Sequence, residues 1–125
     1  MDIAQFERFV GESLADIPEE FRPHLESVQV IVLPQPSRVQ RRLMGLRPRD
    51  ALYGLYEGLT VPERTRLFGE MDGVPPSLIT LFRRPLAADF PEQDELRAEV
   101  RRTVFHELAH HFGISDERLR ELGAY

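Results

Sequence analysis

Apolar side chains recur every four residues in the C-terminal third of the chain, and this repeat limits the possible folds more than any other feature. The repeating residues are Leu96, Val100, Val104, Leu108 and Phe112. The spacing places them on one face of an α-helix. Pro91 suits the first turn of this helix because its φ angle is fixed, and Gly113 suits a left-handed cap at its end. A helix with one apolar face must pack against other elements to bury that face.

Shorter segments earlier in the chain predict elements that can cover this helix. Residues 3–15 have apolar side chains at helical spacing, which predicts an N-terminal helix. Residues 28–33 are short and β-branched, which predicts a strand. Residues 52–57 are a possible strand. Gly54 within it and Gly58 directly after it either weaken the strand or mark a close backbone approach.

The clearest second strand is residues 78–83, and two neighbouring arginines, Arg83 and Arg84, favour a position at the edge of the sheet. The Arg-rich residues 36–50 and the Pro- and Gly-rich residues 60–76 are predicted to be loops. Because a helix and strands precede the long helix, the predicted class is α+β rather than alternating βαβ.

This order of elements predicts strands that pack against the apolar face of the long helix. The chain has 125 residues, which fits a single domain spanning residues 1–125. After Gly113 we expect a short final helix that runs to about Leu122 and is closed by Gly123.

Residues 106–116 read HELAHHFGISD and carry the clearest chemical signal in the sequence. His106 and His110 are four residues apart, so on a helix their imidazoles project from the same face. Two imidazoles at this spacing can share one tetrahedral Zn²⁺ at about 2.0–2.1 Å each. Glu107 lies next to the pair and can take a proton from a water whose pKa zinc has lowered to about 7.

A catalytic zinc needs a third protein ligand and an open position. Asp116 is our candidate, because Gly113 ends the helix and lets the chain turn back within three residues. Glu117, Glu121 or a water are the alternatives. The sequence therefore predicts one Zn²⁺ per chain, bound by His106, His110 and Asp116.

Each of these residues also has an ordinary structural interpretation. The two histidines could form a polar stripe beside the apolar face, and Glu107 could be a solvated acid. Ser115 suits an N-cap, so Asp116 could be a first-turn acid of the final helix. His111 lies towards the apolar face and is predicted to be a packed, hydrogen-bonded histidine. The position of the histidine pair on an independently predicted helix favours the metal site.

Composition excludes several other classes of function. There is no cysteine, so disulfides, cysteine-based zinc sites and thiol nucleophiles are absent. The net charge of −5 argues against nucleic acid as a partner, and the Arg clusters at 38–49 and 83–84 are interpreted as solvated or ion-paired surface. No apolar run approaches a membrane span, and the N-terminal segment does not resemble a signal peptide. We therefore expect a cytoplasmic protein without a membrane partner.

The sequence resembles the small bacterial metallopeptidases called minimal zincins. The resemblance rests on HELAHHFGISD and extends to YGLYEG at 53–58, ITLFRRPL at 79–86 and DERLRELG at 116–123. The resemblance implies a zincin-like minimal fold, in which a small mixed β-sheet packs against the active-site helix and zinc is bound by His106 and His110. It also implies Glu107 as the base and Asp116 as the third ligand.

In larger zincins an edge strand beside the metal binds the peptide in extended form, and residues 78–83 are the corresponding candidate here. Two functions follow. The first is a zinc-dependent peptidase in which Glu107 is the general base. The alternative is a non-catalytic metal-binding or protein-interaction module that retains the zincin fold. Tyr53, Tyr56 and His111 are candidate donors to an oxyanion, and the sequence does not choose among them.

Overall fold

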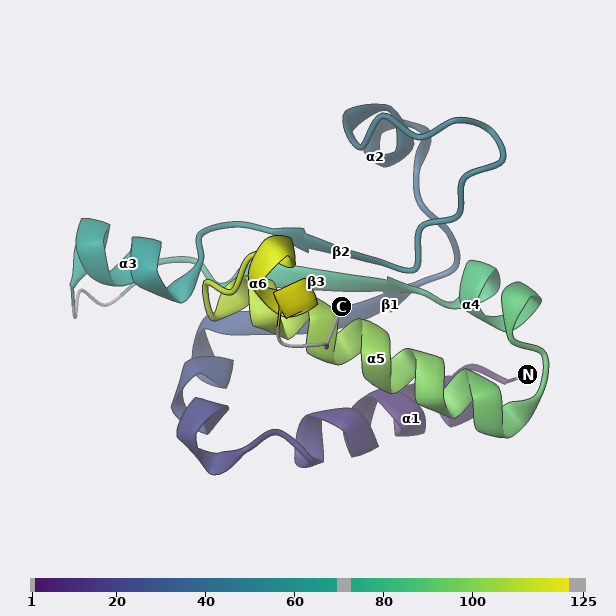
Figure 1. Ribbon diagram of the computed structural model, residues 1–125, viewed down its shortest axis with the longest axis horizontal. Helices are drawn as coiled ribbons and strands as arrows, with labels where there is room; N and C mark the ends of the chain where they lie inside the picture. The colour runs from purple at the N-terminus through teal and green to yellow at the C-terminus, as the bar shows by residue number, and fades with distance from the viewer. Residues whose placement is uncertain (1, 70–72, 122–125) are drawn as a thin grey trace.

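The structure of the protein is a computed structural model that describes residues 2–69 and 73–121 (Figure 1). In chain order its elements are α1 (Ile3–Ala15), η1 (Glu19–Ser27), β1 (Val28–Leu33), α2 (Arg38–Leu43), β2 (Gly54–Glu57), α3 (Val61–Phe68), β3 (Ser77–Phe82), α4 (Arg83–Asp89), α5 (Gln93–His111) and α6 (Asp116–Glu121). The η1 segment is a 3₁₀ helix. The helix predicted at 3–15 and the strand predicted at 28–33 are confirmed, and the possible strand at 52–57 contains β2.

The sheet has the strand order β1-β3-β2 among the described residues. β1 is parallel to β3 and β2 is antiparallel to it, so the sheet is mixed as predicted. The predicted edge position of residues 78–83 is wrong, because β3 is hydrogen-bonded on both sides. Ile79 and Leu81 are fully buried on this strand. The two arginines that suggested an edge, Arg83 and Arg84, instead begin α4.

One face of the sheet is covered by α5, which is itself packed on α1 (Figure 1). The predicted apolar stripe of α5 is confirmed, since Leu96, Val100, Val104 and Leu108 are at most 3% exposed. Phe112, the last member, is half-buried and stacks on Phe21 at a ring-centroid distance of 4.7 Å. This packing confirms the α+β class and fixes the position of the helix that carries the histidines.

Two segments predicted to be loops contain short helices, so these predictions are wrong in part. Residues 36–50 contain α2 and residues 60–76 contain α3. Each helix begins with a capping box, in which the side chain at the N-cap and the side chain three residues later bond to each other's backbone N–H. The proline and glycine content of the two segments concealed these signals.

The predicted final helix begins at Asp116 as α6. Its predicted end at Leu122 and Gly123 lies outside the described residues. Within the described chain, none of the helices has both the length and the apolar composition needed to cross a membrane.

Candidate metal centre

The last two turns of α5 bring His106, Glu107 and His110 together. One potential ligand atom from each residue lies within 4.8 Å of the corresponding atoms of the other two. The imidazole centroids of the two histidines are 4.7 Å apart. Their side chains are 22% and 27% exposed and that of Glu107 is 11% exposed, so the group lies at the surface but is largely shielded from water. The interpretation of Glu107 as a solvated acid is therefore wrong.

The turn after α5 is formed as the sequence predicts. Gly113 has a φ angle of +89°, which a residue with a side chain rarely adopts. The N–H of Ile114 donates to the carbonyl of Ala109 at 2.8 Å, and the N–H of Gly113 donates to that of His110 at 3.0 Å. These two bonds define a Schellman motif. Ser115 then caps α6, since its Oγ accepts from the N–H of Arg118 at 3.1 Å.

This turn returns Asp116 to the histidine pair. Its Oδ1 lies 2.7 Å from Nε2 of His110 and 3.4 Å from Nε2 of His106. Ligands of a tetrahedral zinc, each about 2.0–2.1 Å from the metal, are about 3.3 Å apart. Of the two acidic alternatives, Glu121 pairs with Arg118 at 2.9 Å and Glu117 is exposed. Asp116 is therefore the carboxylate that the fold places against both imidazoles.

The site is electrostatically suited to a cation. Hydrogen bonding to Glu107, with a further hydrogen bond to Asp116, raises the pKa of His110 to about 9. The reciprocal contact with His110 lowers the pKa of the Asp116 carboxyl. In the metal-free protein a proton on His110 thus provides positive charge between two carboxylates. A donor set of two imidazoles and a carboxylate matches the ligands of catalytic zinc sites, so the residues present fit this metal.

Metal-free protein is expected to lose the stabilisation from His110 as the pH rises. The pKa of His110 in the folded state lies above its ordinary value of 6.5, so the folded state binds this proton more tightly than the unfolded chain does. The stabilisation is complete below pH 6.5 and is lost as the pH passes through about 9. Thermal melts of chelator-treated wild type and of chelator-treated His110→Gln, recorded at both ends of this pH range, measure the difference in melting temperature between the two proteins. A difference in melting temperature that does not shrink at the alkaline end would contradict the expectation.

The strand β2 passes directly against the acid of the site. A Cβ atom on Gly54 would lie 2.8 Å from Cγ2 of Thr103 and 3.2 Å from Cγ of Glu107. The backbone of Gly54 therefore lies close to its neighbours, and the atoms that approach it belong to side chains. Between the segment that leads into β2 and the face of α5 lies a groove of about 440 Å³, which reaches the metal site at His106 and Glu107. Its other lining residues are Ala51, Leu52, Tyr53, Gly54, Glu99, Arg102 and Thr103.

His111 is fully buried behind the metal site, as predicted. Its Nδ1 lies 2.6 Å from the hydroxyl of Tyr56, and its Nε2 lies 2.8 Å from Oγ of Ser27. Burial lowers the pKa of His111, which favours the neutral imidazole. These bonds join α5 to β2 and to η1. No local sequence pattern indicated either partner, because both are distant along the chain.

The two candidate tyrosines do not direct their hydroxyl groups at the histidine pair. The hydroxyl of Tyr56 contacts His111 and donates to the carbonyl of Leu59 at 2.7 Å. The hydroxyl of Tyr53 donates to the carboxylate of Asp89. Both hydroxyls therefore have structural partners.

Replacing Gly113 by alanine is expected to destabilise the protein by about 2 kcal/mol, because the φ angle is positive and the methyl group collides with a neighbour. The added Cβ would lie 2.7 Å from Cγ of Pro62 in α3. Denaturant titration measures the effect. Gly11→Ala is the matched control. Gly11 lies within α1, and no described atom beyond its chain neighbours and its own helix backbone lies within 4 Å of the added methyl, so the substitution should stabilise the protein slightly. Equal effects of the two substitutions would contradict this account of the turn.

Comparison with known proteins agrees with this geometry. A family model described as zincin-like metallopeptidase matches residues 25–124. A search of curated proteins found no match.

Proposed function

The chain belongs to the zincin-like metallopeptidase family, and we propose that it is a zinc-dependent peptidase that hydrolyses peptide bonds with Glu107 as general base. One observation supports this most strongly. A single carboxylate oxygen of Asp116 contacts the Nε2 atoms of both His106 and His110, while Glu107 lies beside them. A purely structural zinc site needs four ligands and no adjacent base.

In this proposal His106, His110 and Asp116 hold one Zn²⁺ per chain. When bound, the metal would supply Lewis acidity, which lowers the pKa of water to about 7 and polarises a carbonyl group. The carboxylate of Glu107 accepts the proton of the attacking water and then donates it to the nitrogen of the leaving amine. Its Oε1 is 3.4 Å from Nδ1 of His110, and packing against Gly54 restricts the side chain further.

The peptide is proposed to lie along β2 rather than along residues 78–83. β3 has both edges hydrogen-bonded, whereas β2 pairs with β3 alone in the described sheet. β2 also borders the groove that ends at His106 and Glu107. A substrate in extended form would add a strand to this edge through main-chain hydrogen bonds.

Digestion of a diverse peptide library tests the proposed function. Protein loaded with one equivalent of zinc should produce new peptide termini, which mass spectrometry detects. A chelator should stop the cleavage, and added zinc should restore it. Fully loaded protein that cleaves no peptide of the library would refute the peptidase proposal.

The alternative is a non-catalytic metal-binding or protein-interaction module. One observation favours it, namely that the hydroxyl groups of Tyr53 and Tyr56 are hydrogen-bonded to groups other than His106 and His110. A donor to the developing oxyanion normally supplies a large part of the rate enhancement. Zinc binding without cleavage of any library peptide is the result that this alternative predicts.

Removal of metal is expected to leave the protein folded. The buried cluster that joins α1, α5 and the sheet does not include the metal-site residues. Unlike a zinc finger, the chain therefore does not need metal to form its core. Chelation should lower the melting temperature by a few degrees and leave the far-UV circular dichroism unchanged. Loss of the helical signal on chelation would show that the site is structural.

A further inference from the structure

Positive charge is concentrated in residues 36–50, which we call the basic lobe. It contains five arginines and one aspartate, a net charge of +4, so the other 110 residues carry −9 of the chain's net −5. The lobe includes α2 and connects β1 to β2, and it projects beyond the sheet and its covering helices (Figure 1). A strongly basic projection on an acidic protein has a surface charge that the rest of the molecule cannot provide.

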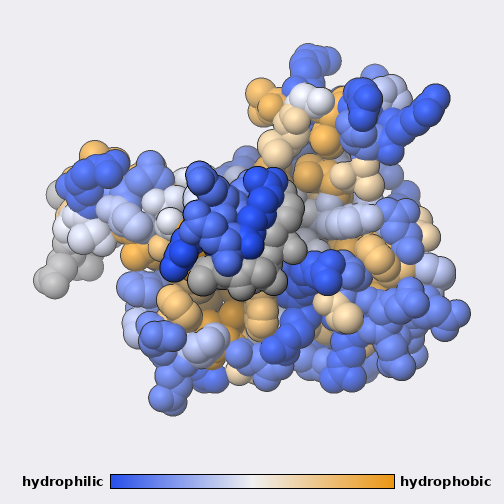
Figure 2. Space-filling view, viewed as in Figure 1, coloured by the Kyte–Doolittle hydropathy of each residue, from blue (hydrophilic) through white to orange (hydrophobic). Residues whose placement is uncertain are grey.

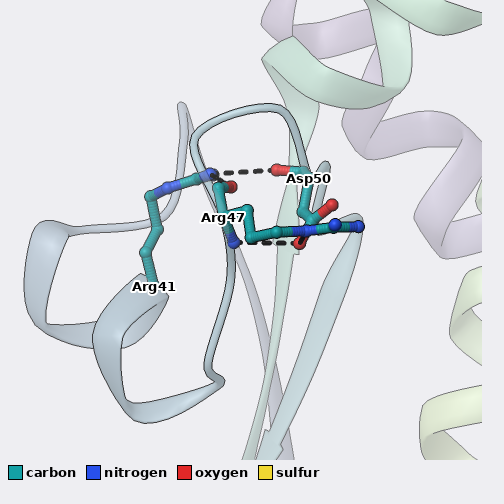
Figure 3. A network of polar contacts seen from close by, with 3 residues as sticks. All are labelled: Arg41, Arg47 and Asp50. Carbon is teal, nitrogen blue, oxygen red and sulfur yellow. Dashed lines mark hydrogen bonds and ion pairs between the residues drawn. The ribbon is translucent and has the colours of Figure 1, made fainter.

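Hydrogen bonds within the lobe hold its shape. Nη2 of Arg41 donates to the carbonyl of Arg47 at 2.7 Å and to that of Asp50 at 3.0 Å (Figure 3). Oδ2 of Asp50 accepts from the backbone N–H of Arg47 at 2.9 Å. The capping box of Ser37 and Gln40 fixes the start of α2. The lobe is therefore an ordered surface, and Arg41 and Asp50 maintain it.

Other arginines of the lobe remain available to a partner. Arg38 and Arg42 are exposed on α2, and Arg49 is exposed on the following segment. None of the three forms an ion pair with a described residue. Three large apolar side chains of the lobe are also exposed, Val39 at 60%, Leu43 at 80% and Met44 at 48%. Figure 2 shows apolar and hydrophilic side chains close together on this projection. Arginines around exposed apolar groups are typical of protein-binding surfaces.

The lobe is also connected directly to the groove of the metal site. Its last residue, Asp50, is followed by Ala51 and Leu52, which line the groove that reaches His106 and Glu107. A polypeptide that lies in this groove and extends past Leu52 has the basic lobe as its neighbour.

We propose that the basic lobe docks an acidic segment of the polypeptide substrate, with aliphatic side chains of that segment packing on Val39, Leu43 and Met44. This proposal rests on the proposed peptidase function and specifies its substrate class. A peptide needs negative charge only where it meets the lobe. An anionic membrane or a nucleic acid presents continuous negative charge, which the net −9 of the remaining chain repels.

Binding to metal-free protein tests the proposal independently of cleavage. The probe is a short fluorescein-labelled peptide rich in Glu and Leu, with a Lys and Leu peptide of the same length as the counter-probe, and the readout is fluorescence anisotropy. Arg38→Gln with Arg42→Gln should weaken binding of the acidic probe about fivefold, and added salt should weaken it for the wild type. The matched control is Arg8→Gln with Arg66→Gln, two exposed arginines outside the lobe, which should leave the affinity within about twofold of wild type.

Leu43→Ser tests the apolar part of the surface and should weaken the acidic probe severalfold without lowering the melting temperature. Equal binding of the two probes, or equal effects of the lobe and control variants, would overturn the proposal. Tighter binding of phosphatidylglycerol vesicles or of a single-stranded oligonucleotide than of the acidic probe would also overturn it.

Cleavage assays separate this proposal from the proposed function. If the zinc-loaded protein cuts peptides without preferring acidic ones, and the lobe variant cuts them equally well, the lobe proposal fails while the peptidase stands. If the lobe binds the acidic probe but the loaded protein cuts no peptide, the peptidase fails while the lobe stands as a docking surface for acidic polypeptides.

Discussion

Glu107→Gln is expected to lower the rate of peptide hydrolysis by about 10²–10⁴-fold, the usual contribution of a positioned general base. The amide keeps the size of the side chain and its ability to hydrogen-bond to water, but it cannot accept the proton. Zinc affinity should stay within a few-fold of wild type, because the proposed ligands are unchanged. The ratio of kcat/KM for the two proteins, measured on a peptide that the wild type cleaves, gives the size of the effect.

Two controls show whether a lower rate comes from loss of the general base. Glu99→Gln alters another acid that lines the same groove, and it should change kcat far less than Glu107→Gln does. Zinc content must be measured for each variant, so that loss of metal is not mistaken for loss of the base. Equal cleavage by wild type and Glu107→Gln at equal zinc content would show that the proposed mechanism is wrong, even if the metal site is correct.

Replacing both His106 and His110 by alanine is expected to abolish zinc binding. The two imidazoles supply the nitrogen ligands, and without them the only proposed ligand that remains is the carboxylate of Asp116, which is 48% exposed. Isothermal titration of metal-free protein with zinc should give about one site per chain for the wild type and none for the double variant.

His24→Ala is the matched control for this experiment. It removes an exposed imidazole that contributes only its backbone carbonyl to the buried contacts of His111. Its zinc uptake should equal that of the wild type. The metal-site assignment would be wrong if the double variant took up as much zinc as the control.

Local periodicity predicted the parts of the fold that local forces determine. The four-residue repeat on α5 predicted the helix. The glycine at its end predicted the left-handed cap and the turn that brings Asp116 back to the histidine pair. All three depend on residues that are close together in the chain. Helix 3–15 and strand 28–33 were predicted with their observed bounds for the same reason. The helical spacing also predicted that His106 and His110 project from one face of the helix, with Glu107 beside them.

Contacts between distant segments could not be predicted from the sequence. The two arginines after β3 indicated an edge strand, but strand order depends on β1 and β2 pairing with it from opposite sides. The partners of His111, Ser27 and Tyr56, lie 84 and 55 residues away in sequence.

The crystal structure of protein grown with one equivalent of zinc, with anomalous data collected on both sides of the zinc absorption edge, tests the central claim most directly. We predict one anomalous peak per chain, in contact with Nε2 of His106, Nε2 of His110 and a carboxylate oxygen of Asp116, with Glu107 beside it and not bound to it. A peak located away from the histidine pair, or no peak from protein that has taken up zinc in solution, would contradict it.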